Sequence, residues 1–189
     1  FPEKDQGVVK EVHDLTPTEL IAGVHALNRG LDFRGFKLRA PTRFCVGATL
    51  DLGKGIEREA RLAGKKVGAG AQFFLTQPLS EPRGALAFLS LYQGLTGERL
   101  AAPVFWGIQV LVKEGLLFGD VPSKVREDLE RGRPGVEIAA EVVERFLGEG
   151  LDTFYLVPPI LKGGVREYEA AGQVIGAFQG QRVQSPKGS

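Results

Sequence analysis

The sequence of 189 residues is poor in the residue types that form disulfides and metal sites. It has one cysteine, Cys45, so no disulfide can form within the chain, which fits a reducing cytoplasm. Its two histidines, His13 and His25, lack the spacing of metal ligands, so we expect no metal site and give both histidines little catalytic weight. Methionine is absent, even at position 1, which predicts a processed product, an excised domain or a fragment.

The sequence also lacks an excess of charge of one sign, and it has no long apolar run. The formal net charge is +1, from 24 basic and 23 acidic residues, so we expect no nucleic-acid partner and no polybasic contact with a membrane. The longest apolar run, 101–112, is too short for a transmembrane helix, which needs about 20 residues. No signal-peptide pattern opens the sequence, and we therefore expect a cytoplasmic protein without a membrane partner.

The chain does have short apolar runs that alternate with amphipathic segments. Thr16, Pro17 and Glu19 form a helix-start signal, in which Thr16 caps and Glu19 completes a capping box. Strands that are apolar on both sides and separated by helices are typical of parallel βαβ units. The predicted strands are 44–48, 73–75, 104–112 and 154–157, and the predicted helices are 17–30, 56–67, 81–94, a short one from 121, 136–147 and 167–178.

Two α/β architectures agree with four such units. One is an open, doubly wound sheet. The other is half of a TIM (β/α)8 barrel, of which only about the last four βα units would be present, since a whole barrel typically needs about 250 residues. Periodicity alone does not choose between them. A dinucleotide-binding loop is disfavoured, because Gly68-Ala69-Gly70 lies before a strand and not after one.

Polar groups follow the predicted strands, where parallel α/β folds carry their sites. Thr49 and Asp51 follow the first strand, and Thr76 and Gln77 follow the second. No Ser-His-Asp arrangement and no Walker loop is apparent. Amides and hydroxyls favour binding of a large polar organic cofactor over nucleophilic catalysis.

Simpler structural roles are available for the same residues. Gln77 is, by position alone, more often an ordinary residue at a strand end. Lys66 lies late in a helix and is by default a surface lysine that complements the helix dipole. Glu59 lies seven residues earlier on the same helical face and is by default solvated.

Three segments in collinear order resemble one family. GKKVGAGAQFFLTQP (64–78) resembles the helix-strand signature of methylenetetrahydrofolate reductases, in which Lys-Val-x-Ala-Gly-Ala leads to Thr-Gln. Residues 12–50 are similar to the segment after the family's fourth strand, and VPPILKGGVREYEAAGQVI (157–175) is similar to its final strand and helix, particularly in forms fused to a homocysteine S-methyltransferase. The resemblance implies that residues 1–180 are the C-terminal half of the family's barrel. The polar tail at 181–189 is expected from its composition to be disordered.

The resemblance also implies an activity, which is the FAD-dependent reduction of 5,10-methylenetetrahydrofolate to 5-methyltetrahydrofolate in one-carbon metabolism and methionine supply. NAD(P)H or another donor would reduce the flavin. Gln77 matches the glutamine that binds the pterin ring of the folate, and Phe118 matches a phenylalanine that stacks on substrate. Lys66 matches a lysine at the FAD phosphates, Glu59 an acidic residue at a ribose hydroxyl, and Ala48 with Thr49 a strand end at the flavin.

The resemblance further implies that this chain alone is incomplete as an enzyme. The family's catalytic glutamate and its flavin-tuning aspartate belong to the first half of the barrel, so no catalytic residue is expected here. We therefore expect an N-terminal half-barrel or a partner subunit, and weak or no flavin binding by the isolated chain. Residues 51–54 (DLGK) replace a loop that relatives fill with Pro-Glu-x-His. That difference motivates an alternative, a non-catalytic relative acting as a structural or assembly subunit of a folate or corrinoid system.

Overall fold

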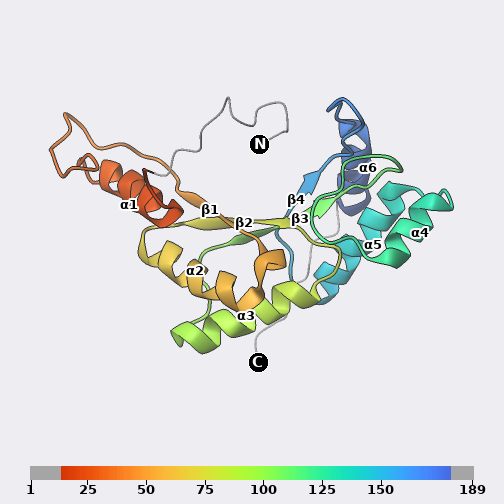
Figure 1. Cartoon of the computed structure of the whole chain (residues 1–189), viewed down its shortest axis with the longest axis horizontal. Helices are drawn as coiled ribbons and strands as arrows, with labels where there is room; N and C mark the ends of the chain where they lie inside the picture. Colours follow the sequence, from red (N-terminus) through yellow and green to blue (C-terminus); the bar gives the residue numbers. More distant parts are fainter. Residues whose placement is uncertain (1–13, 180–189) are drawn as a thin grey trace.

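The computed structural model describes residues 14–179 as an α/β fold on one four-stranded parallel sheet, with the strand order β1-β2-β3-β4 (Figure 1). The elements are α1 (Pro17–Asn28), β1 (Gly47–Leu50), the 3-10 helix η2 (Leu52–Lys54), α2 (Ile56–Gly68), β2 (Phe73–Pro78), α3 (Arg83–Thr96), β3 (Val104–Gln109), α4 (Ser123–Glu130), α5 (Gly135–Gly148), β4 (Phe154–Val157) and α6 (Tyr168–Phe178). His13 and the tail expected at 181–189 lie outside the described residues.

The first helix begins as its sequence predicts. Thr16 Oγ1 accepts a hydrogen bond from the backbone N–H of Glu19 at 3.3 Å, and the Glu19 carboxylate accepts one from Thr16 N–H at 2.7 Å. This is the reciprocal capping box, and Pro17 stands at the first helical position. The hydrogen bond from the Thr16 backbone holds the pKa of the Glu19 carboxyl below its ordinary value.

The strand boundaries differ from the predicted ones. The first strand begins at Gly47 and not at Phe44, because side chains hydrogen-bond the backbone that precedes it. The Asn28 side chain donates to the carbonyl of Phe44 and accepts from its N–H, and the Gln72 side chain accepts from Val46 N–H. The second strand continues to Pro78, and the third ends at Gln109 and not at Val112. The predicted helices are all present, with ends shifted by one to two residues, and the fourth strand is as predicted.

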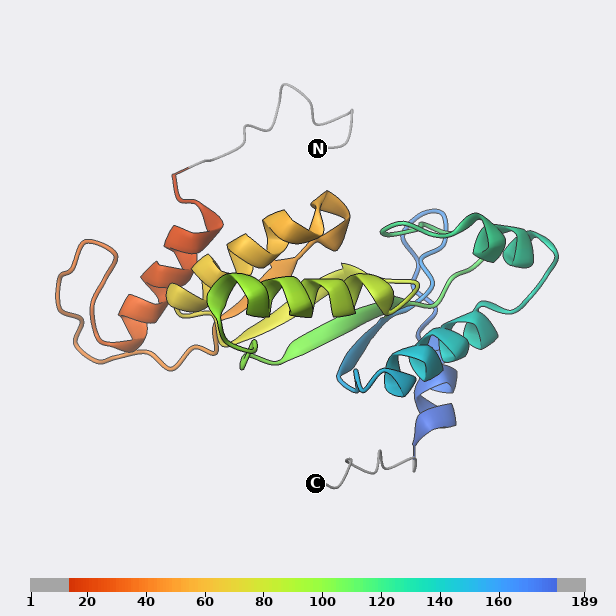
Figure 2. The ribbon, with the colours of Figure 1, turned by 90° about the horizontal axis from the view of Figure 1, so that it is seen from below.

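The strand order bears on the choice between the two α/β architectures. Each strand pairs in parallel with the next one along the chain. A doubly wound sheet reverses its strand order at a switch point, and the described strands show no such reversal. Helices α2 and α3 lie together on one face of the sheet (Figure 2). The described strands therefore do not form a doubly wound sheet, and their order is compatible with part of a barrel.

One hydrophobic core lies between the sheet and its helices. Phe74 of β2, Phe88 of α3 and Phe146 of α5 are fully buried there. The ring of Phe146 contacts both Trp106 of β3 and Phe154 of β4, with ring centres 6.4 and 6.0 Å apart. The flanking helices belong to the same core, since α1 contributes Ile21 and α6 contributes Val174.

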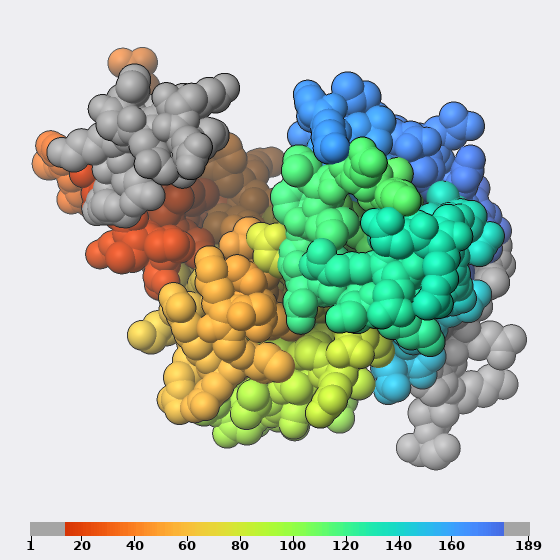
Figure 3. Space-filling view, turned by 45° about the vertical axis from the view of Figure 1, so that its right-hand side comes forward, coloured from red at the N-terminus to blue at the C-terminus, as the bar shows by residue number. Residues whose placement is uncertain are grey.

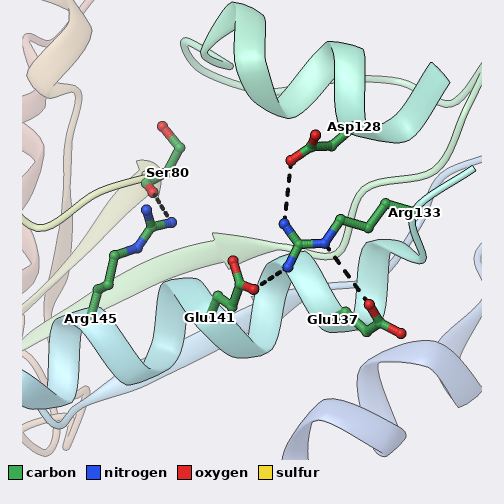
Figure 4. A network of polar contacts seen from close by, with 6 residues as sticks. All are labelled: Ser80, Asp128, Arg133, Glu137, Glu141 and Arg145. Atoms are coloured by element: carbon green, nitrogen blue, oxygen red, sulfur yellow. Dashed lines mark hydrogen bonds and ion pairs between the residues drawn. The ribbon is translucent and has the colours of Figure 1, made fainter. Parts of the chain in front are cut away.

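A second, smaller cluster holds the excursion that follows β3. Leu111, Val121, Leu129 and Ile138 pack together there and join α4 to α5. On the surface of this join, Arg133 contacts Asp128, Glu137 and Glu141 (Figure 4). These partners come from both helices, so the guanidinium ties the end of α4 to the start of α5.

Candidate functional site

The face of the sheet away from the helices carries the side chains that could meet a ligand. Along β2, Phe74, Thr76 and Pro78 are buried, whereas Leu75 and Gln77 are exposed and Phe73 is partly buried. This alternation follows from the strand period of two, because successive side chains point to opposite faces. We call the face of Leu75 and Gln77 the open face. The sequence had placed Gln77 after the second strand, whereas the structure places it within that strand.

A bulge in β2 sets the position of Gln77. The pairing register between β2 and β3 shifts between Leu75 and Pro78. At this shift Thr76 Oγ1 accepts from Gly107 N–H at 2.9 Å, and the Tyr155 hydroxyl donates to the Thr76 carbonyl oxygen. Both bonds fasten β2 across two neighbouring strands. Burial raises the pKa of the Tyr155 hydroxyl above its ordinary value.

Gln77 borders a cavity of about 200 Å³ at the carboxyl ends of the first three strands. Asp51 and Gly53 enter from the segment after β1, Glu81 from the segment before α3, and Asp120 from the loop after β3. Within residues 14–179, no hydrogen bond occupies the Gln77 amide. We call this cavity the mouth site. Its lining combines apolar and polar residues, and it offers one amide, that of Gln77, which can both donate and accept.

The loop after β3 is held over the mouth site by a buried amide. Gln109 Nε2 donates to the Leu116 carbonyl at 2.7 Å, and its Oε1 accepts from Phe118 N–H at 2.8 Å. Gln109 is therefore a clamp that fixes the backbone on which Phe118 is carried. The side chain of Phe118 lines a narrower cavity that shares Pro78 and Asp120 with the mouth site. In Figure 3 the green loop lies beside the yellow residues that end β2.

Lys66 and Glu59 are buried, so their default surface roles are wrong. Lys66 Nζ donates to the Thr49 carbonyl at 2.6 Å, and Glu59 Oε2 accepts from Asp51 N–H at 3.3 Å. The two charged groups lie 3.9 Å apart. Burial lowers the pKa of Lys66, and the nearby Glu59 carboxylate partly offsets that effect. Both side chains reach back from α2 to the backbone at the carboxyl end of β1, which a helical-face argument does not reveal.

A second cavity, of about 400 Å³, lies at the free edge of β1. Ala48, Thr49 and Lys66 line it together with Leu75 of the open face. The structure thus brings three of the four residues expected at the flavin to one cavity. Glu59 does not line it and is placed behind Lys66, against the backbone of Asp51.

Residues 14–179 contain no cluster of three or more His, Cys, Asp or Glu side chains arranged to hold a metal ion. No helix in that range has both the length and the apolar character needed to cross a membrane.

Comparisons with known proteins found similarity among solved structures. No family model and no curated protein matches the sequence. Among solved structures, the fold is similar to that of an uncharacterized protein from Clostridium thermocellum that binds two copies of 5-methyl-5,6,7,8-tetrahydrofolic acid. The identity is 15%, the TM-score is 0.47, and the match covers 70% of this chain and 52% of that one. The match therefore spans about half of that chain's length. At this identity and TM-score, the likeness assigns no function to this chain.

Two residues of the site were not identified by their roles from the sequence. From the sequence, Gln109 was one residue of the predicted strand 104–112, and Tyr155 was one residue of the predicted strand 154–157. A signal was present for Tyr155, because a tyrosine in a buried strand needs a partner for its hydroxyl. No local pattern names that partner, since Tyr155 and Thr76 are separated by 79 positions.

Proposed function

We propose that this chain is half of a (β/α)8 barrel that binds a reduced folate at the carboxyl ends of its strands. The observation that carries the proposal is the Gln77 amide, which lies on the open face and borders the mouth site. Functional sites of such barrels lie at this end of the strands. The sequence resemblance of residues 64–78 supports the same glutamine as the folate contact.

The open face supports a barrel interior. Bulky and small residues alternate across it: the ring of Phe73 covers Gly47, and the ring of Tyr155 covers Gly107. A Cβ on either glycine would come within 3 Å of the covering ring. Alternation of large and small side chains is typical of the interior of small barrels, where it fills the tapered space.

The chemistry of a pterin suits the mouth site. The edge of a pterin ring presents N–H donors beside carbonyl and ring-nitrogen acceptors, and a side-chain amide can pair with both kinds of group. Phe118, partly exposed beside the same segment, supplies an apolar ring for stacking against the substrate. In this proposal Gln77 orients the pterin and Phe118 holds the adjacent part of the folate.

In this proposal part of a flavin lies only at the carboxyl end of the cavity at β1, and the rest of that cavity is left for a neighbouring strand. Ala48 and Thr49 offer a small residue and a hydroxyl, and Lys66 offers a cation suited to a phosphate. Glu59 fits less well, because its carboxylate already accepts from Asp51 N–H. FAD would supply hydride transfer to the methylene group of the folate. The residues of this chain would bind and orient, and the acid-base group would come from the completing half.

The folate proposal is tested by calorimetric titration of the chain with 5-methyltetrahydrofolate. We expect saturable binding that Gln77→Ala weakens about 10-fold or more, since an unpaired polar edge costs about 1–3 kcal/mol. Gln93→Ala, an exposed glutamine on α3, is the matched control and should leave affinity unchanged. Absence of binding by the unaltered chain, or equal losses in the two variants, would overturn the proposal.

The flavin part is tested separately by the visible absorbance of protein purified after incubation with FAD. We expect weak or no retention by the chain alone, and retention once the other half is supplied. Stoichiometric FAD on the chain alone would contradict the half-site. Folate binding without flavin in the completed assembly would instead favour the non-catalytic subunit.

A further inference from the structure

Both outer strands of the sheet have a free side. Within the described residues β1 pairs only with β2, and β4 pairs only with β3. Each is four residues long and parallel to its neighbour. A free edge presents N–H and C=O groups that another strand can pair with.

An apolar cavity accompanies each free edge, beneath a flanking helix. At β1 the cavity of about 400 Å³ lies between Leu20 and Ile21 of α1 and the strand itself. At β4 a cavity of about 360 Å³ lies between Val174 and Phe178 of α6 and the strand residues Phe154 and Leu156. Figure 1 shows α1 and α6 at opposite ends of the sheet. Each flanking helix therefore overhangs the position that a next strand would take.

The number of helices then decides what kind of unit can occupy both edges. Five helices (α1, α2, α3, α5 and α6) pack into the core of a sheet with four strands. In a (β/α)8 barrel, eight helices surround eight strands, with one helix over each gap between strands. This chain already brings the helix for the gap at β1 and the helix for the gap at β4. What remains to be supplied is four strands and three helices.

We propose that the open face and both edges bind a partner half-barrel that begins and ends on a strand, with the order β-α-β-α-β-α-β. Its first strand pairs with β4 under α6, and its last strand pairs with β1 under α1. The inference rests on the proposed barrel and specifies its missing half. The partner's inward side chains meet the open face, where Leu75 and the contacting rings of Phe73 and Phe105 are presented.

The same count excludes a second copy of this chain as the occupant. Two copies would place β4 of one beside β1 of the other. The gap between those strands would then receive α6 from the first copy and α1 from the second, although it has room for one helix. A symmetric closed barrel of two copies therefore does not form while both helices are present.

The test mixes the chain with two probes and measures complex mass by light scattering after gel filtration. The short probe is the first four strands and three intervening helices of a methylenetetrahydrofolate reductase barrel. The long probe adds the fourth helix of that barrel. We expect a one-to-one complex with the short probe and at least 10-fold weaker binding of the long probe, because its last helix collides with α1. Equal binding of the two probes, or no complex with either, overturns the proposal.

A matched pair of substitutions tests whether the open face is the surface that binds the partner half-barrel. Leu75 on the open face and Leu86 on the outside of α3 are almost equally exposed, at 36% and 37%. Leu75→Glu should abolish the complex with the short probe, whereas Leu86→Glu should leave it intact. Equal effects of the two changes, or a homodimer of the chain that Leu75→Glu dissociates, would contradict the assignment. The mass of the complex and the heat of folate binding are separate measurements. A complex that forms without folate binding would contradict only the proposed folate function. Folate binding without a complex would contradict only this inference.

Discussion

The two faces of the same four strands differ in what covers them. On the helix-covered face, Phe74, Phe88 and Phe146 are fully buried. On the open face, Leu75 and Gln77 are exposed, although the strands carry apolar residues on both sides. Strands buried on one face only usually alternate apolar with polar residues. The apolar character of the open face therefore indicates a surface that another part of a protein covers, and one of its polar residues, Gln77, lies at the end where a site is expected.

The largest expected effect is on the helix-covered face. Phe146→Ala removes a fully buried ring that contacts Trp106 and Phe154. We expect the free energy of unfolding in urea to fall by about 3–5 kcal/mol, as for large-to-small changes in a core. A loss below about 1 kcal/mol would show that this face is not the main core.

A smaller loss is expected from the clamp over the mouth site. Gln109→Ala removes two hydrogen bonds and leaves the Leu116 carbonyl and Phe118 N–H without their partner. We expect about 2 kcal/mol of destabilisation and faster amide hydrogen exchange confined to residues 110–120. Gln93→Ala is the control and should change stability by less than about 0.5 kcal/mol. Unchanged exchange in the loop would refute the clamp.

A substitution on the open face should change the free energy of unfolding only slightly until a partner covers that face. Leu75→Ala removes a side chain that is already more than a third exposed, so we expect about 1 kcal/mol or less. With the half-barrel partner bound, the same change should cost at least twice as much. Urea unfolding of the chain and of the complex compares the two states directly. An equally small cost in both would mean that the partner does not touch Leu75.

The smallest effect is a change with pH at the edge of β1. Because burial lowers the pKa of Lys66 in the folded chain below 10.5, the unfolded chain binds the proton more tightly. Stability should therefore rise with pH between the folded pKa and the ordinary lysine value, and this rise should be lost in Lys66→Met. Carbon-13 titration by NMR should give Lys66 a pKa below the ordinary lysine value of 10.5. An ordinary value for Lys66 would show that this side chain is solvated.

The sequence largely predicted which helices and strands are present, but it did not predict where they begin and end. Thr16, Pro17 and Glu19 specify the start of α1 because capping is a local interaction over three positions. The first strand began later than predicted because Asn28 and Gln72, 16 and 26 positions away, bind the backbone that precedes it. Such bonds depend on where distant segments meet, and an apolar run does not report them.

The candidate site divides in the same way. Gln77 could be chosen from its position behind an apolar run, and it does border the mouth site. Lys66 and Glu59 were assigned to solvent by default, whereas the fold buries both at the end of β1. The sequence showed that the two side chains share a helical face. It did not show that this face packs against the end of β1, because that contact forms only in the tertiary structure.

The sequence by itself determined the alternation of strands and helices, because hydrophobic period and capping act over a few residues. It also determined that the strands are apolar on both faces. Only the tertiary structure decided that the strands follow one another in order, that the helices share one face, and that the other face is open. The reason is that strand pairing joins residues far apart in the chain, whose meeting depends on the whole fold and not on any local pattern.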